Sequence, residues 1–178
     1  MKTQLVFFST LFLCLAAIGA DKKASVGASD EKFLKAAADN SFAEAELARL
    51  GVQKAASAEV KELAQMLVTD QGNLNESIKA LAESKAVMLS AVIEPSGATA
   101  FRALERFTGK PFDDAFLSRM QSMESKTIDA FEKASKKAED GDVKSFAEKT
   151  LPTLRNHLDR LDKLAPPPSE PPAISIGP

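Results

Sequence analysis

The sequence predicts an all-α protein, a bundle of four long helices arranged as two helical hairpins that a long crossover joins. Two observations support this prediction. Only 8 of the 178 residues are glycine, and most of the prolines lie near the C-terminus, so the intervening chain is rich in residues that favour helices. Apolar residues also recur at three- and four-residue steps along four long stretches, which is the period of a helix with one buried face.

The first 20 residues have the pattern of a secretory signal peptide. Lys2 supplies a positive charge, an apolar run extends over residues 5–18, and small residues follow it, so cleavage is expected after Gly19 or Ala20. The run is shorter than the roughly 20 apolar residues that a membrane span needs. We therefore expect an exported protein, periplasmic or extracellular, with no membrane span after cleavage.

The single cysteine lies inside this predicted signal peptide. Lipidation of Cys14 is an alternative, but Leu13 is bulky where a lipoprotein signal has a small residue directly before the cysteine. If the signal is removed, the mature protein has no disulfide and no thiol chemistry.

The first predicted helix follows a flexible leader. Residues 21–28 are small and polar, and the helical domain is expected to span residues 29–165. Ser29 is expected to cap the first helix, with two acidic residues in its first turn. The helix is expected to end near Gly51, although the small and polar residues up to Ala56 could continue it. Its apolar stripe is Phe33, Ala37, Ala43, Leu47 and Leu50.

The second helix is predicted from Ser57, another good N-cap, to about Ser84. Its stripe is Val60, Leu63, Leu67, Leu74, Ile78 and Leu81. Residues 85–97 are apolar without a clear period, so we expect a crossover that packs on the core. A short helix over about 98–108 should follow and stop at Gly109.

The third helix is predicted to begin near Pro111, a favoured first-turn residue, and to end at Gly141. Asp142 is expected to cap the fourth helix, which runs to the end of the domain and should kink at Pro152. The stripe of the third helix is Phe112, Phe116, Met120, Met123, Thr127 and Phe131, and that of the fourth is Val143, Phe146, Leu151, Leu154, Leu158 and Leu161. Residues 166–178 are proline-rich and are expected to be disordered or polyproline-like.

The charge of the chain gives no reason to expect nucleic acid or an anionic membrane as a partner. Its 23 basic and 25 acidic residues leave a formal net charge of −2, and loss of Lys2 with the signal makes it more negative. The basic cluster at Lys133, Lys136 and Lys137 lies where a helix ends, and it is expected to complement the helix dipole.

Four polar residues interrupt the apolar stripes and are predicted to face inward. They are Glu44, Gln71, Glu124 and His157, one on each helix, with Glu46 as a competitor for the inward position of Glu44. The first two are about equally distant from the turn of the first hairpin, and the last two from that of the second. Each pair can therefore lie at one height inside the bundle.

Buried carboxylates need partners, because an unpaired buried charge is costly. We expect Glu124 to pair with His157, and the favoured interpretation is a structural polar layer without a cofactor. The alternative is a single divalent ion (Fe, Mn or Zn) held weakly by Glu44, Glu124 and His157. A di-metal site would need Glu-x-x-His on two helices, and Val68 and Leu154 occupy the positions where Glu is required.

Five segments of the chain resemble the domain-of-unknown-function 4142 family, which comprises exported bacterial proteins with a ferritin-like bundle. The segments are residues 33–38 (FLKAAA), 43–47 (AEAEL), 60–70 (VKELAQMLVTD), 112–117 (FDDAFL) and 150–158 (TLPTLRNHL). Their order and spacing extend the resemblance over about residues 30–164. The resemblance implies a ferritin-like four-helix bundle with a crossover and an exported location, and it supplies no established activity.

Two residues depart from the family pattern. The family usually has His after the aspartate of its second helix, where this chain has Gln71, and His in the middle of its third helix, where this chain has Glu124. Only His157 is kept. If the inward histidines of the family bind metal, this chain has lost two of them.

The composition also argues against an enzyme. The mature chain would have no cysteine, no tyrosine, one histidine and no glycine-rich phosphate loop. The sequence therefore predicts a non-enzymatic helical bundle of the bacterial cell envelope, with an unknown envelope partner or a role in envelope stress. Weak metal binding by the inward layer is the alternative.

Overall fold

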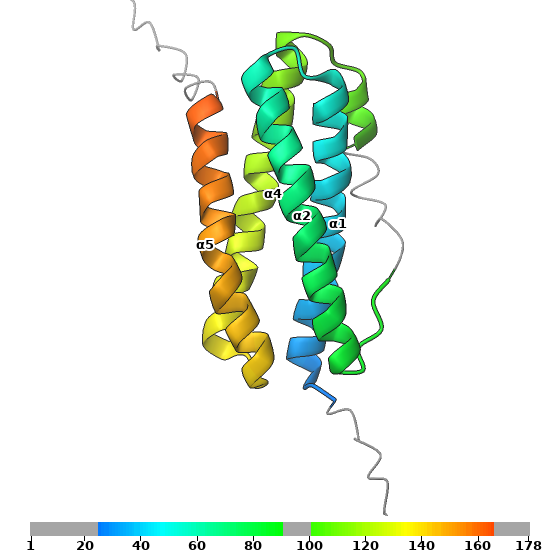
Figure 1. The fold of residues 1–178 in the computed structure, drawn as a ribbon, viewed down its shortest axis with the longest axis vertical. Helices are drawn as coiled ribbons and strands as arrows, with labels where there is room; N and C mark the ends of the chain where they lie inside the picture. The colour runs from blue at the N-terminus through cyan, green and yellow to red at the C-terminus, as the bar shows by residue number, and fades with distance from the viewer. Residues whose placement is uncertain (1–24, 91–100, 166–178) are drawn as a thin grey trace, which may run out of the picture.

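A computed structural model describes residues 25–90 and 101–165 of the chain, and in these residues all regular structure is helical. Four long helices lie side by side: α1 (Ala28–Lys54), α2 (Ala58–Ser84), α4 (Lys110–Lys137) and α5 (Gly141–Leu164) (Figure 1). The most extensive contacts join α1 to α2 and α4 to α5, while α1–α4 and α2–α5 contacts are fewer. The predicted all-α bundle of two hairpins is thus confirmed.

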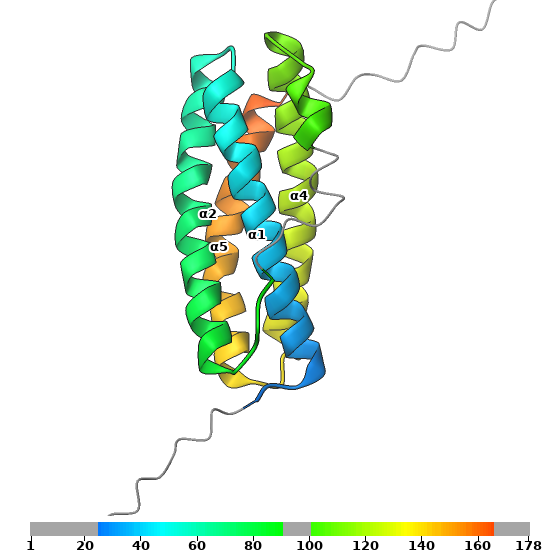
Figure 2. The same cartoon turned by 90° about the vertical axis from the view of Figure 1, so that its right-hand side faces the viewer.

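Several predicted segments lie outside the described residues. These are the signal peptide at 1–20, the first half of the leader (residues 21–24), part of the crossover at 91–97 and the proline-rich tail at 166–178. The described part of the crossover runs back along the bundle beside α1 and α2 (Figure 2). None of the helices in the described residues has the length and apolar character that a membrane crossing requires.

Two predicted N-caps are wrong. Gly27 precedes α1 without a side-chain cap, and Ser29 lies within the first turn. Asp140 rather than Asp142 caps α5, because its carboxylate accepts hydrogen bonds from the backbone N–H groups of Asp142 and Val143. α4 already ends at Lys137, so the glycine expected to end it is instead the first residue of α5.

Other predicted boundaries are confirmed. Ser57 caps α2 by accepting a hydrogen bond of 3.1 Å from the Val60 N–H. Pro111 lies in the first turn of α4, and Pro152 lies inside α5. In the described residues the short helix covers 101–105 and ends before the predicted 108.

The first helix was expected to end near Gly51 or to continue up to Ala56, and α1 in fact continues past Gly51 to Lys54. The reason for this glycine is close packing. A Cβ atom at this position would lie 2.7 Å from the Phe116 ring and 2.9 Å from the Ala64 Cβ. Only a residue without a side chain allows α1 to approach α4 and α2 so closely. Close packing, and not the end of the helix, therefore explains why this position is a glycine.

The core consists of two main apolar clusters at different heights. One surrounds Leu67, Phe116 and Met120, and the other surrounds Ile78 and Phe131. On every helix, the residues of the two clusters lie on either side of the inward polar residue that the sequence predicts. The polar layer therefore separates the two apolar clusters of the core.

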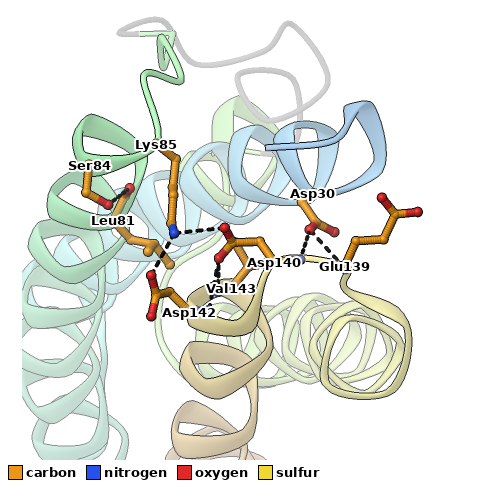
Figure 3. A network of polar contacts seen from close by, with 8 residues as sticks. All are labelled: Asp30, Leu81, Ser84, Lys85, Glu139, Asp140, Asp142 and Val143. Atoms are coloured by element: carbon orange, nitrogen blue, oxygen red, sulfur yellow. Dashed lines mark hydrogen bonds and ion pairs between the residues drawn. The ribbon is translucent and has the colours of Figure 1, made fainter. Parts of the chain in front are cut away.

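The turn of the second hairpin is bound to the first hairpin (Figure 3). The Asp30 carboxylate on α1 accepts hydrogen bonds from the backbone N–H groups of Glu139 (3.1 Å) and Asp140 (2.8 Å). Lys85, just after α2, forms ion pairs with Asp140 (2.8 Å) and Asp142 (2.6 Å). The hydrogen bond to Asp140 raises the pKa of Lys85, and Lys85 in turn lowers the pKa of Asp140.

The opposite end of the bundle repeats this arrangement. Asp113 on α4 accepts hydrogen bonds of 2.9 Å from the backbone N–H groups of Ala56 and Ser57, in the turn of the first hairpin. Each turn is therefore held by a carboxylate from the other hairpin. These contacts fix the relative height of the hairpins and so align the polar layer.

Candidate functional site

The four predicted inward residues form one buried layer, with one residue from each long helix. Glu44 of α1, Gln71 of α2 and Glu124 of α4 are 0% exposed, and His157 of α5 is 2% exposed. Glu46, the competitor of Glu44, is instead partly exposed and pairs with Arg49 on the surface.

The Glu44 side of this layer is fully hydrogen-bonded. The Gln71 Nε2 group donates to Glu44 Oε2, and the Thr127 hydroxyl donates to Glu44 Oε1 at 2.9 Å. Ser41 completes the set by donating to Gln71 Oε1 at 2.8 Å. Three helices are thus joined through one carboxyl group in the middle of the core.

The His157 side is less complete. His157 Nε2 lies 3.0 Å from Asp70 Oδ2, and Nδ1 lies 3.3 Å from Glu124 Oε1. Within the described residues, neither Glu124 oxygen nor Nδ1 has a well-formed hydrogen bond. Asp70 is 35% exposed, so the chain of polar contacts leads from the core to the surface.

Burial and a neighbouring carboxylate perturb the carboxyl group of Glu44. Burial raises the pKa of Glu44 well above its ordinary value, the neighbouring Glu124 carboxylate raises it further, and the Thr127 hydrogen bond opposes this only in part. The Glu44 carboxyl group therefore keeps its proton to a higher pH than an exposed glutamate does.

The imidazole of His157 is subject to opposing effects. Burial lowers the pKa of His157, but the contacts with Glu124 and Asp70 outweigh burial, so the pKa is raised overall. The ring therefore favours the charged form while it lies between two carboxylates.

A cleft of about 400 Å³ opens beside this histidine, between α2 and α5. Asp70 and His157 lie in its lining, together with Asn73, Ser77 and Thr153. A larger groove of about 690 Å³ lies elsewhere, over α1, α2 and the start of the crossover.

The sequence prediction missed three members of the polar layer. Ser41 lies one helical turn before Glu44, and that spacing could have revealed it. Thr127 was assigned to the apolar stripe, although its hydroxyl bonds to Glu44. Asp70 directly precedes Gln71, and no periodicity argument singled it out because it lies at the edge of the buried face.

Within the part of the chain that the structure describes, no group of three or more His, Cys, Asp or Glu side chains has the arrangement of a metal site. Glu124 contacts both Glu44 and His157, yet these three predicted ligands do not converge on one point.

Comparison with known proteins gives one match. No curated protein and no solved structure matches the chain. The family model described as Domain of unknown function (DUF4142) matches residues 15–164, which include all four long helices and the whole polar layer. Because this match covers most of the chain, and the residues that carry the resemblance lie on its four helices, the chain belongs to the domain-of-unknown-function 4142 family.

Proposed function

We propose that this chain is an exported, non-enzymatic, ferritin-like helical bundle of the bacterial cell envelope, which acts by binding a partner protein there. Two hairpins, a long crossover and inward polar residues from all four helices support the ferritin-like assignment. The observation that carries the partner-binding function is the groove over α1 and α2.

This groove presents apolar side chains to the solvent. Met88 is 86% exposed and Phe42 is 39% exposed, and both line the groove. Exposed apolar side chains gathered around a concave surface mark interaction sites, and methionine adapts its shape to different partners. Charged residues such as Arg49 and Glu76 also line the groove and supply polar contacts for a partner.

Photocrosslinking in intact cells tests this assignment. A photoreactive amino acid at Met88 should capture a discrete partner, whereas the same group at exposed Arg160 on α5, outside the groove, should not. Identical products from both positions, or none from Met88, would contradict partner binding at the groove. Pull-downs with and without residues 166–178 separate the groove from the proline-rich tail, because the groove partner should remain when the tail is removed.

The export part of the proposal rests on the N-terminal sequence pattern. Intact mass measurement of the protein from the periplasmic fraction should show the loss of residues 1–19 or 1–20. Full-length protein found only in the cytoplasm would rule out export. The non-enzymatic part rests on composition, because the mature chain would contain one histidine and neither cysteine nor tyrosine.

In this proposal the polar layer is structural, and it sets the register of four helices whose apolar faces could otherwise slide. A second candidate function is weak binding of one divalent ion by Glu44, Glu124 and His157, and its one supporting observation is that neither Glu124 oxygen has a well-formed hydrogen bond within the described residues. Metal analysis after incubation with Fe(II), Mn(II) or Zn(II) separates the two. His157→Ala should release a bound ion under the second candidate, and should only lower stability under the first.

A further inference from the structure

We infer that Met88 is an oxidation site, at which hydrogen peroxide converts the thioether to methionine sulfoxide and thereby weakens partner binding at the groove over α1 and α2. The oxidation itself depends on the exposure of this side chain. Its effect on binding rests on the proposed function, because Met88 lines the groove proposed as the partner site. Dedicated reductases convert methionine sulfoxide back to methionine, so the change is reversible.

Met88 is the one exposed methionine among the described residues. It is 86% exposed, whereas Met120 is 0% exposed and Met66 and Met123 are partly buried against the same apolar cluster. The oxidant must reach the sulfur atom, so a buried thioether is protected. Cys14, the single cysteine of the chain, lies in the predicted signal peptide. Within the described residues, Met88 is therefore the sulfur-containing side chain that meets an oxidant first.

The chain on either side of Met88 holds it in this position. Lys85 fixes the end of α2 through its ion pairs (Figure 3). The Val87 N–H then donates a hydrogen bond of 2.8 Å to the Ala82 carbonyl oxygen, and the Val87 side chain is buried in the apolar core. Leu89, on the other side, also packs against the core. Because both neighbours point inward, Met88 points outward and cannot turn into the core without displacing them.

Oxidation changes the chemical character of the groove. A lone pair of the Met88 sulfur attacks one oxygen of hydrogen peroxide, so an S–O bond forms and the O–O bond breaks. The S–OH proton passes to the departing hydroxide and water leaves, while sulfur loses two electrons and the peroxide is reduced. Met88 and Phe42 are the exposed large apolar side chains that line the groove. A sulfoxide oxygen buried there against an apolar partner surface lacks a hydrogen-bond donor, which weakens binding.

Timed treatment of the purified mature protein with hydrogen peroxide tests the site itself. Catalase stops each reaction, and digestion with mass spectrometry then measures the sulfoxide at each methionine. Met88 should oxidise at least about tenfold faster than Met120, and also faster than Met66 and Met123. In urea the four rates should become similar, because the fold is the source of the selectivity. Oxidation of Met88 in the folded protein no faster than that of the other three would overturn the inference.

Photocrosslinking from a second groove residue tests the effect on binding. A photoreactive amino acid replaces exposed Lys79, and the protein is treated with peroxide, freed of it and mixed with envelope extract, so that the partner is not oxidised. Capture should fall at least about fivefold after treatment, and methionine sulfoxide reductases should restore it. Met88→Leu forms no sulfoxide, so its treated and untreated samples should capture equally. Met88→Gln, which carries a polar oxygen, should capture as little as the oxidised protein.

The outcomes separate this inference from the proposed function. No capture from Lys79 before treatment would contradict partner binding at the groove and with it the effect of oxidation, and the oxidation rates would still decide whether Met88 is the modified site. Capture that stays unchanged after full oxidation of Met88, or that falls equally in Met88→Leu, would overturn the inference while leaving partner binding intact.

Discussion

Replacing Glu44 with glutamine should stabilise the bundle at neutral pH and not at acid pH. The Glu44 carboxyl group is fully buried, and its pKa in the folded protein is raised well above the ordinary 4.5. Below pH 4.5 folded and unfolded chains both carry the proton, so the stabilising contribution is complete there. As the pH rises from that value towards the folded pKa, only the unfolded chain releases its proton, and this contribution is lost.

The size of the effect follows from the linkage between protonation and folding. Each pH unit between the unfolded and folded pKa lowers the free energy of unfolding by about 1.4 kcal/mol. Glutamine mimics the protonated acid, but its one oxygen can accept from only one of Gln71 and Thr127, which costs about 1 kcal/mol. The variant should thus be slightly less stable than wild type near pH 4.5, and it should gain stability relative to wild type as the pH rises towards the folded pKa of Glu44.

Urea denaturation followed by circular dichroism across this pH range measures the difference. Glu46→Gln, a change of the same kind on the exposed side of α1, is the control and should keep the pH dependence of wild type. The raised pKa of His157 also lowers stability as the pH rises, and this contribution remains in both variants. Parallel pH profiles for wild type and Glu44→Gln would refute the raised pKa of the buried Glu44 carboxyl group.

Three further changes test the end of the bundle and the packing. Lys85→Met should cost about 1–3 kcal/mol at neutral pH. Lys85 lowers the pKa of Asp140 in the folded protein below its ordinary 3.8. The loss of stability should therefore disappear as the pH falls through this lowered pKa, because Asp140 is then protonated and no longer pairs with Lys85. Gly51→Ala should destabilise by about 1–3 kcal/mol through its clash with the Phe116 ring. Gly72→Ala, also within a helix but with nothing within 4 Å, should instead stabilise by about 0.5–1 kcal/mol in thermal unfolding. Equal effects of the two glycine changes would contradict the close approach at Gly51.

The helical period was enough to predict the four long helices and the burial of their inward polar residues. On each helix, apolar residues bracket the polar residue, so the period places its side chain without any knowledge of the neighbours. Local capping was harder to predict. Asp140 and Asp142 are both good N-caps two residues apart, and the choice depends on where α4 ends and on the ion pairs with Lys85.

The connections across the bundle could not be predicted in the same way. A helical period shows which face a residue occupies, but not which atoms on other helices it meets. The bond from Thr127 to Glu44 joins residues 83 positions apart, and the contact of His157 with Asp70 depends on the looser packing of α2 against α5. The hairpin turns held by Asp30 and Asp113 set these heights, and both are contacts between hairpins.

The most direct test of the account is the metal content of the protein after incubation with Fe(II), Mn(II) or Zn(II) and gel filtration in metal-free buffer. In the proposed account the buried polar layer is structural and holds no ion. The account therefore predicts less than about a tenth of an ion per chain. Close to one retained ion per chain, lost in Glu44→Gln, would contradict it and support the metal site of the second candidate function.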